Sequence, residues 1–280
     1  MKKKEIKDLV KLNIYLLLPI ILYSLYKNGY LIYEKGLISF INIFKPLYLI
    51  IIGVIIKIII DLIRYKKINI DYELIYVILI AMIMPYNISY LVYVTSFIPL
   101  YIISLLLDKV IKYNKVCFIY LVIILINFIF NDYTFMTPLE NNYTFSFTFL
   151  NLIMGRMVGG IASTSILFSL LAYIVLITNY YYKKDIPFFI NISYLFCMIV
   201  YYYVTKNSDL LLNSELVFGS IFVATLPMSS PYKEKTQIIE SIIIGILTFI
   251  LSIYFNSIIT IYISIFIMSF IPNIKWFKFR

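Results

Sequence analysis

The chain has 280 residues, of which 62% are hydrophobic and 14% charged, with a mean hydropathy of +0.95 and a net charge of +10. This composition excludes a soluble domain and indicates an integral membrane protein, in contact with lipid. Positive loops of a membrane protein account for the net charge, so we expect no nucleic-acid partner. The sequence lacks histidine, which removes His-based catalysis and haem ligation, and Cys117 and Cys197 lie in apolar runs, where neither a disulfide nor a metal is expected.

The first half of the chain carries five apolar runs. They cover residues 12–26, 47–63, 72–84, 90–107 and 116–130, and we expect the first to end in a polar turn, Lys27-Asn28-Gly29. The N-terminal segment MKKKEIKDLVK has five lysines, which favours the cytoplasmic side of the membrane. The third run is short and stops at Pro85. In the second run, Lys57 and Asp61 lie one helical turn apart and are expected to pair near the inner interface.

The second half repeats this pattern after a long interruption. Its five apolar runs cover residues 161–182, 188–205, 216–230, 238–255 and 258–274, and the third is again short and broken, by Pro227 and Pro231. The interruption, residues 131–165, concentrates hydroxyl groups and glycines in one place. Irregular backbone at membrane depth survives only where protein or water satisfies it, so we expect function to lie here.

The charges predict the topology. Ten spans divide the termini and loops between the two sides of the membrane, and the segments on one side hold 18 of the 24 Lys and Arg residues. Because positive segments stay cytoplasmic, this predicts a multi-pass plasma-membrane protein with both termini cytoplasmic and residues 131–150 outside. Five spans per half give the halves opposite topology, and paired broken segments in matching positions indicate an inverted repeat. The alternative is that proline is simply tolerated in membrane helices. We predict an all-α fold of about ten transmembrane helices, with repeats 1–130 and 161–280 around an extracytosolic loop, 131–160, and with broken helices near Pro85 and Pro227.

Four stretches together resemble one family, the D subunit of the Rnf electron-transport complex and the B subunit of the sodium-pumping NADH:quinone reductase. Residues 79–89, LIAMIMPYNIS, are similar to a run of small and apolar residues ending in Leu-Pro-Pro. Residues 134–139, TFMTPL, resemble Ser-Gly-Ala-Thr-Pro-Leu. Residues 155–165, GRMVGGIASTS, resemble Gly-x-x-x-Gly-Ser-Ile-Gly-Glu-Thr-Ser, and residues 222–231, FVATLPMSSP, resemble Phe-Met-Ala-Thr-Asp-Pro-Val-Thr-Ser-Pro. The resemblance covers roughly residues 70 to 255.

The resemblance implies a flavin site. In that family the last Thr of Ser-Gly-Ala-Thr carries FMN through a phosphoester bond on the outer face, and Thr137 is the matching residue. The resemblance thus implies FMN at Thr137, with riboflavin as a second candidate cofactor. Phe135 and Met136 replace the family's Gly and Ala, and this bulky pair disfavours loading by a transferase. Ser163 and Leu226 stand where the family has Glu and Asp, so two intramembrane acids of the family are missing. Such acids usually mark ion paths, so their loss indicates a diverged paralogue, or a subunit whose ion coupling is carried elsewhere or lost.

Several other residues are candidates for cofactor binding, each with a plainer alternative. Arg156 suits a phosphate group but also suits lipid headgroups at the interface. Glycines at membrane depth admit a close cofactor or let two helices pack. Membrane hydroxyls line pockets or back-bond to their own helix. The candidate set is Thr134, Thr137, Arg156, Gly159, Thr164, Ser165 and Thr225.

We therefore expect a membrane subunit of a flavin-dependent electron-transport complex of the Rnf type. The subunit carries or contacts FMN on its outer face, and the complexes that it resembles translocate ions. It is not an enzyme on its own, because it lacks a soluble nucleotide-binding domain and requires partner subunits. One alternative is a solute channel or transporter, since urea-type channels share the same type of inverted fold. The other is a scaffold subunit that carries no flavin.

Overall fold

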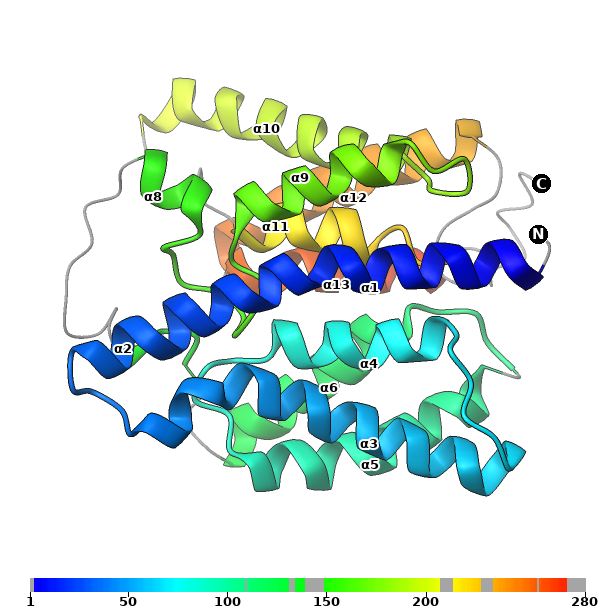
Figure 1. Ribbon diagram of the computed structural model, residues 1–280. Helices are drawn as coiled ribbons and strands as arrows, with labels where there is room; N and C mark the ends of the chain where they lie inside the picture. Colours follow the sequence, from blue (N-terminus) through cyan, green and yellow to red (C-terminus); the bar gives the residue numbers. More distant parts are fainter. Residues whose placement is uncertain are drawn as a thin grey trace.

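Nearly all of the described chain is helical. The computed structural model describes residues 3–108, 110–130, 134–138, 149–206, 214–227, 234–255 and 257–270, and within these stretches every regular element is a helix (Figure 1). This confirms the predicted all-α fold.

The first half contains one very long helix and four further spans. Its elements are α1 (Lys3–Leu25), a π-helical turn η1 (Tyr26–Tyr30), α2 (Leu31–Glu34), a 3₁₀ turn η2 (Phe40–Phe44), α3 (Lys45–Tyr65), α4 (Tyr72–Ile83), α5 (Tyr90–Leu107) and α6 (Lys115–Phe130). The first apolar run was predicted to end at Tyr26 in a polar turn, Lys27-Asn28-Gly29. That prediction is wrong: the helix continues through η1 into α2, and all three residues of the supposed turn are buried.

The second half begins with an irregular stretch and then repeats the series. Its elements are α8 (Phe149–Met154), α9 (Ile166–Ile177), α10 (Asp185–Thr205), α11 (Ser214–Phe218), a π-helical turn η4 (Gly219–Val223), α12 (Glu234–Tyr254) and α13 (Ser257–Phe270). The predicted run 161–182 starts later than expected, because residues 155–165 are not helical and α9 begins only at Ile166.

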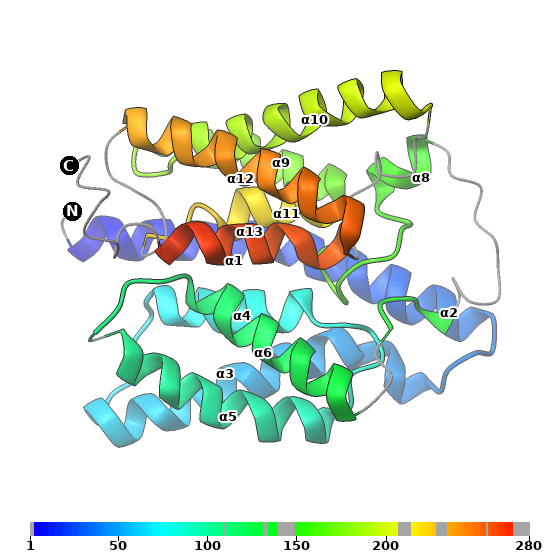
Figure 2. The same cartoon turned by 180° about the vertical axis from the view of Figure 1, so that it is seen from behind.

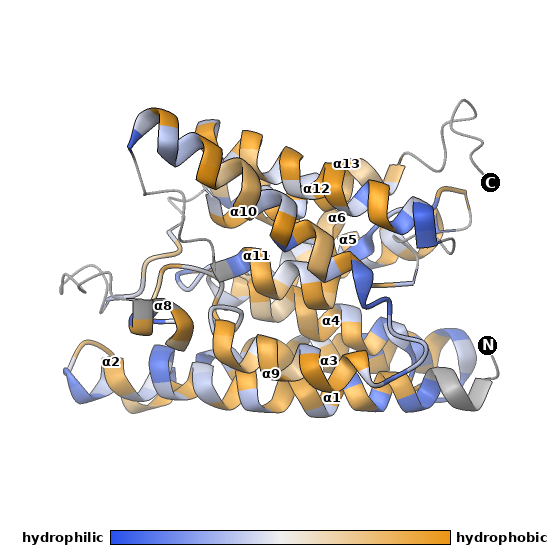
Figure 3. Ribbon diagram, turned by 90° about the horizontal axis from the view of Figure 1, so that it is seen from above, coloured by the Kyte–Doolittle hydropathy of each residue, from blue (hydrophilic) through white to orange (hydrophobic). Residues whose placement is uncertain are grey.

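Helix length divides the spans into two groups. Among the described residues, five helices are long and apolar enough to cross a membrane, within Lys7–Glu34, Phe40–Tyr65, Tyr90–Leu107, Asp185–Thr205 and Glu234–Tyr254. The apolar helices α4, α6, α9 and α13 are shorter. Figure 3 shows apolar residues along the middle of the long helices and hydrophilic residues mainly near their ends. This is the pattern of a multi-pass membrane protein.

The two halves follow the same course in opposite directions. The series α1, α3, α4, α5, α6 corresponds to α9, α10, α11–η4, α12, α13, and each helix points opposite to its counterpart (Figures 1 and 2). The counterparts α1 and α9 pack together, and so do α6 and α13. Contacts between counterparts are what a two-fold relation between the halves produces. The first and last described residues lie on the same side of the molecule, which we call the terminal side.

The two broken segments end as their prolines require. Helix α4 stops at Ile83, and Met84 is extended, because the residue before a proline is excluded from helical geometry. Ser89 then caps α5 by accepting a hydrogen bond from the Val92 amide at 3.2 Å. The α11–η4 segment ends at Val223, shortly before Pro227. Both short segments therefore leave backbone groups inside the protein that must find partners.

Candidate functional site

The segment between α8 and α9, residues 155–165, is folded back on itself at the centre of the molecule. Gly155 has φ of +77°, in the left-handed region that favours glycine. A Cβ at this position would lie 2.5 Å from the Thr164 carbonyl oxygen and 2.7 Å from the Ser165 Cα. The segment can close only because residue 155 has no side chain. We call residues 155–165 the interface segment.

The interface segment completes the broken end of α4. The Ile161 amide donates to the Met84 carbonyl at 2.7 Å, and the Ala162 amide donates to the Met82 carbonyl at 2.8 Å. These bonds supply donors for carbonyl groups that the end of a helix leaves without partners. Irregular backbone from the second half thus satisfies a broken helix of the first half, deep inside the protein.

A buried carboxylate lies on the other side of the interface segment. Glu215, near the start of α11, is 0% exposed. Its Oε1 accepts hydrogen bonds from the Gly160 amide at 2.9 Å and from the Ser163 hydroxyl at 2.6 Å. Its Oε2 accepts from the Tyr262 hydroxyl of α13 at 2.5 Å, and the Tyr262 ring lies 4.8 Å from that of Tyr120 on α6. We call Glu215, its three donors and Lys27 the Glu215 cluster.

Lys27 supplies the opposite charge from the first half. It lies in η1 and is 5% exposed. Its ammonium group donates to the Met157 carbonyl at 2.5 Å and to the Thr164 hydroxyl at 3.5 Å, and its positive charge acts on Glu215. A buried ion is costly unless an opposite charge and hydrogen bonds accompany it. The Glu215 cluster provides both, and it joins η1, the interface segment, α11 and α13 in one polar centre.

The structure separates the predicted binding residues into several places. Thr164 belongs to the polar centre through Lys27. Ser165 caps α9 by accepting from the Phe168 amide, and Gly159 is buried in the interface segment. Arg156 is exposed and hydrogen-bonds to Tyr23 of α1. Thr225 lies at the far end of η4 and donates to the Ile221 carbonyl of its own helix at 2.7 Å, which is the back-bonded alternative.

The predicted flavin segment is partly described, as residues 134–138. Thr134 is exposed; its amide donates to Asn87 Oδ1 at 3.1 Å, and its hydroxyl accepts from the Met136 amide at 3.0 Å. Met136 is 50% exposed, whereas Phe135 and Thr137 are each only 3% exposed. The remainder of the predicted loop, residues 131–133 and 139–148, lies outside the described residues.

Comparison with known families assigns the chain. The model of the NQR2, RnfD, RnfE family matches residues 110–277, more than half of the chain. The chain belongs to this family. A comparison with curated proteins finds no match. The family match includes the interface segment, Glu215 and Tyr262, but Lys27 and α4 precede it.

The family's covalent flavin can be tested against the segment around Thr137. Attachment through a phosphoester requires the threonine hydroxyl to be accessible, yet the Thr137 side chain is buried. Phe135, at a position where the family's motif has glycine, is also buried and belongs to the hydrophobic core. This arrangement does not fit an FMN attached to Thr137.

Sequence reasoning missed the central acid. Ser163 replaces the family's Glu, and an intramembrane acid was therefore expected to be missing there. The structure corrects this expectation at Ser163, because the carboxylate of Glu215 reaches its hydroxyl from another helix. The signal available in the sequence was an acid at the edge of one apolar run and a lysine directly after another, since ionised groups are rarely placed at membrane depth without a role.

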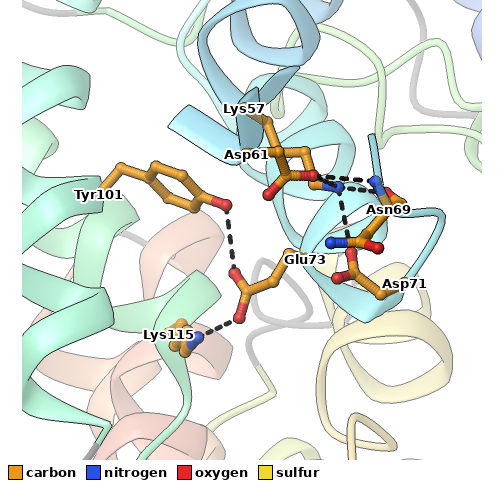
Figure 4. A network of polar contacts seen from close by, with 7 residues as sticks. All are labelled: Lys57, Asp61, Asn69, Asp71, Glu73, Tyr101 and Lys115. Atoms are coloured by element: carbon orange, nitrogen blue, oxygen red, sulfur yellow. Dashed lines mark hydrogen bonds and ion pairs between the residues drawn. The ribbon is translucent and has the colours of Figure 1, made fainter. Parts of the chain in front are cut away.

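A second polar network lies near the terminal side of the first half (Figure 4). Lys57 is 1% exposed; its ammonium group lies 2.5 Å from Asp61 and 3.2 Å from Asp71 and also donates to the Asn69 carbonyl. This confirms the predicted pairing of Lys57 with Asp61.

The same network continues on α6 and α5. Lys115 pairs with Glu73 and with Asp108, and the Tyr101 hydroxyl contacts Glu73 at 3.4 Å. Glu73 is the second residue of α4, just as Glu215 is the second residue of α11. The short helix of each half thus begins with an acid that bonds to a residue on α6 or on its counterpart α13.

Proposed function

We propose that this chain is the membrane subunit of a flavin-dependent electron-transport complex of the Nqr and Rnf type. The family match over residues 110–277 carries the proposal. Members of the NQR2, RnfD, RnfE family are subunits of such complexes, so the partners are further membrane and peripheral subunits. The chain itself supplies position and environment for chemistry that a cofactor performs.

We further propose that the segment around Met136 contacts FMN without carrying it. Met136 and Thr134 are exposed, whereas Thr137 is buried. The segment therefore presents a surface to a flavin held by a partner subunit, and it withholds the hydroxyl that a transferase would need. Covalent FMN at Thr137 is the competing hypothesis from the family resemblance, and riboflavin bound to the chain is a further one.

The Glu215 cluster argues against an open solute channel. A channel of this fold type would need a wet path between the two halves. Among the described residues, the position between the halves is filled by the buried groups of Lys27, Glu215 and Tyr262. The electron-transport proposal does not require such a path.

The proposal is tested with the chain purified from its native membrane. We expect redox subunits with flavin to co-purify, and we expect deletion of the chain to remove flavin-dependent electron transport from the membranes. Purification of the chain without any redox partner, together with unchanged electron transport after deletion, would overturn the proposal.

The mode of flavin contact is decided by mass spectrometry of the peptide covering residues 131–156. We expect no FMN mass on the wild-type peptide, because Thr137 is buried. Phe135→Gly with Met136→Ala removes the buried Phe135 ring and should allow loading, and Thr137→Val in that background should abolish it. FMN on the wild-type peptide at Thr137 would refute contact without attachment and leave the subunit assignment intact.

A further inference from the structure

Lys45, the first residue of α3, carries a charge that the protein leaves without an acceptor. Its ammonium group lies 5.1 Å from the centre of the Tyr86 ring and 5.9 Å from that of the Tyr90 ring. Within the described part of the chain, no oxygen accepts a hydrogen bond from this group and no carboxylate pairs with it. An ammonium group has three donors, and the face of an aromatic ring attracts its charge without replacing an oxygen acceptor.

One of these two rings carries a second donor that has no acceptor. Tyr90 is the first residue of α5, and its hydroxyl is buried without a hydrogen-bond partner among the described residues. The Tyr90 ring also lies 6.3 Å from that of Tyr48, in the first turn of α3. The first turns of α3 and α5 are therefore side by side, and each helix presents the positive end of its dipole there. Unsatisfied donors beside two helix N-termini favour an anion with several oxygen atoms.

The position of these donors in the membrane indicates which anion they meet. Helix α3 lies in the candidate span Phe40–Tyr65 and α5 is a candidate span itself, and both begin on the side opposite the terminal side (Figures 1 and 2). The donors therefore lie at the level of the lipid headgroups, where tyrosine is common. Below them, exposed aliphatic side chains follow one face of each helix: Ile51, Ile55 and Ile59 on α3, and Leu91, Ile98 and Ile102 on α5. A phosphate position above two apolar stripes matches a phospholipid with two acyl chains.

We propose that Lys45 and Tyr90 hold the phosphate group of an anionic glycerophospholipid in the leaflet opposite the terminal side. The ammonium and phenol groups donate to phosphate oxygens, Tyr86 packs its ring against the ammonium, and the acyl chains lie along α3 and α5. Phosphatidylglycerol is favoured over phosphatidylcholine, because the choline group would bring a second positive charge close to Lys45. This site goes beyond the proposed function and does not depend on contact with a flavin.

The experiment titrates the purified full-length chain in detergent with phosphatidylglycerol or phosphatidylcholine and counts bound lipid by native mass spectrometry. We expect the wild type to prefer phosphatidylglycerol. Lys45→Met keeps the apolar stem and removes the charge, so its affinity should fall about tenfold, the loss expected for one charge-assisted hydrogen bond. Tyr90→Phe removes only the hydroxyl and should bind phosphatidylglycerol several-fold more weakly than the wild type. Lys45→Arg keeps the charge and should retain the preference.

Lys206→Met is the matched control. The Lys206 ammonium also lies over two tyrosine rings, at 5.9 Å from the centre of Tyr202 and 5.6 Å from that of Tyr203. It belongs to the C-terminal end of α10, where the negative end of the helix dipole disfavours an anion. This variant should therefore bind phosphatidylglycerol as the wild type does.

Competition separates a lipid from a soluble phosphate. Inorganic phosphate, glycerophosphoglycerol and FMN are each added at the concentration of the lipid, and we expect none of them to displace phosphatidylglycerol, because they lack acyl chains. Displacement by any of the three would assign the donors to a soluble phosphate and overturn the lipid site. Wild-type affinity in folded Lys45→Met or in folded Tyr90→Phe would overturn it too, and so would an equal loss in Lys206→Met.

Discussion

Replacing Gly160 by alanine should destabilise the protein strongly, because this residue lies where three elements meet. A Cβ at Gly160 would lie 2.4 Å from the Ser163 hydroxyl oxygen and 2.8 Å from the Ile83 Cα. The first contact can be relieved by a side-chain movement, but the second is with backbone and requires α4 and the interface segment to separate. Overpacking of this kind costs about 1–3 kcal/mol.

The same movement strains the hydrogen bond from the Gly160 amide to Glu215. Hydrogen bonds inside membrane proteins are worth about 0.6 kcal/mol on average, and bonds to charged groups more, about 1.5–3 kcal/mol. Together the two effects predict a loss of roughly 2–4 kcal/mol in the free energy of unfolding.

Gly219→Ala is the matched control. Its Cβ would meet only side-chain atoms of Ile261, at 3.0 and 3.3 Å, and of Tyr262, at 3.5 Å. Alanine is also favoured over glycine in a helix by roughly 1 kcal/mol, so the net change should stay within about 1 kcal/mol. Equilibrium unfolding in mixed micelles, followed by labelling of the buried Cys117, measures both variants. Equal stability of Gly160→Ala and Gly219→Ala would refute the close packing of α4 against the interface segment.

Three further predictions concern charge and topology. Burial lowers the pKa of Lys183 to about 8, and the negative charge of Glu240 partly opposes this lowering. The rate of Lys183 acetylation, measured by mass spectrometry, should therefore have its midpoint near pH 8, and Glu240→Gln should move that midpoint to lower pH. A midpoint at the pH of an ordinary lysine would contradict this. Lys57→Met leaves the buried Asp61 carboxylate without its counter-charge and should lower the free energy of unfolding by about 3–5 kcal/mol. Adding Asp61→Leu should restore most of this loss. No recovery in the double variant would show that the two residues are not coupled. Residue 142 lies outside the described residues, and the Asn142→Cys variant should react with an impermeant maleimide on intact cells. Labelling only after lysis would reverse the predicted orientation.

The sequence predicted the helical framework well, because hydropathy and proline act locally. Apolar runs of the right length became helices, and Pro85 ended α4 where expected. An odd number of spans in each half also predicted the opposite directions that the helices take. The repeat boundaries at 130 and 161 and the orientation in the membrane stay predictions.

The centre of the molecule was harder to predict because its residues meet only in three dimensions. Comparing the sequence with the family's motif found Ser163 in place of an acid, but such a comparison cannot show that Glu215 reaches the same point from α11. Lys27 and Asn28 were expected in a polar turn because asparagine and glycine favour turns and lysine is charged. Burial in η1 overrode that local preference. Thr137 was expected on an extracytosolic loop with FMN attached, and its burial depends on the three-dimensional packing of the segment, which the sequence does not show.

The position of the family match has a consequence for how the molecule can be divided. Residues 110–277 carry the family's sequence, yet the groups that complete their polar centre, Lys27, Asn28 and the end of α4, all come before residue 110. A fragment beginning at residue 110 would contain Glu215 without its counter-charge and the Ile161 and Ala162 amides without their acceptors. We therefore expect the stretch that matches the family not to fold on its own. Co-expressed as a separate polypeptide, the stretch before residue 110 should restore it by fragment complementation.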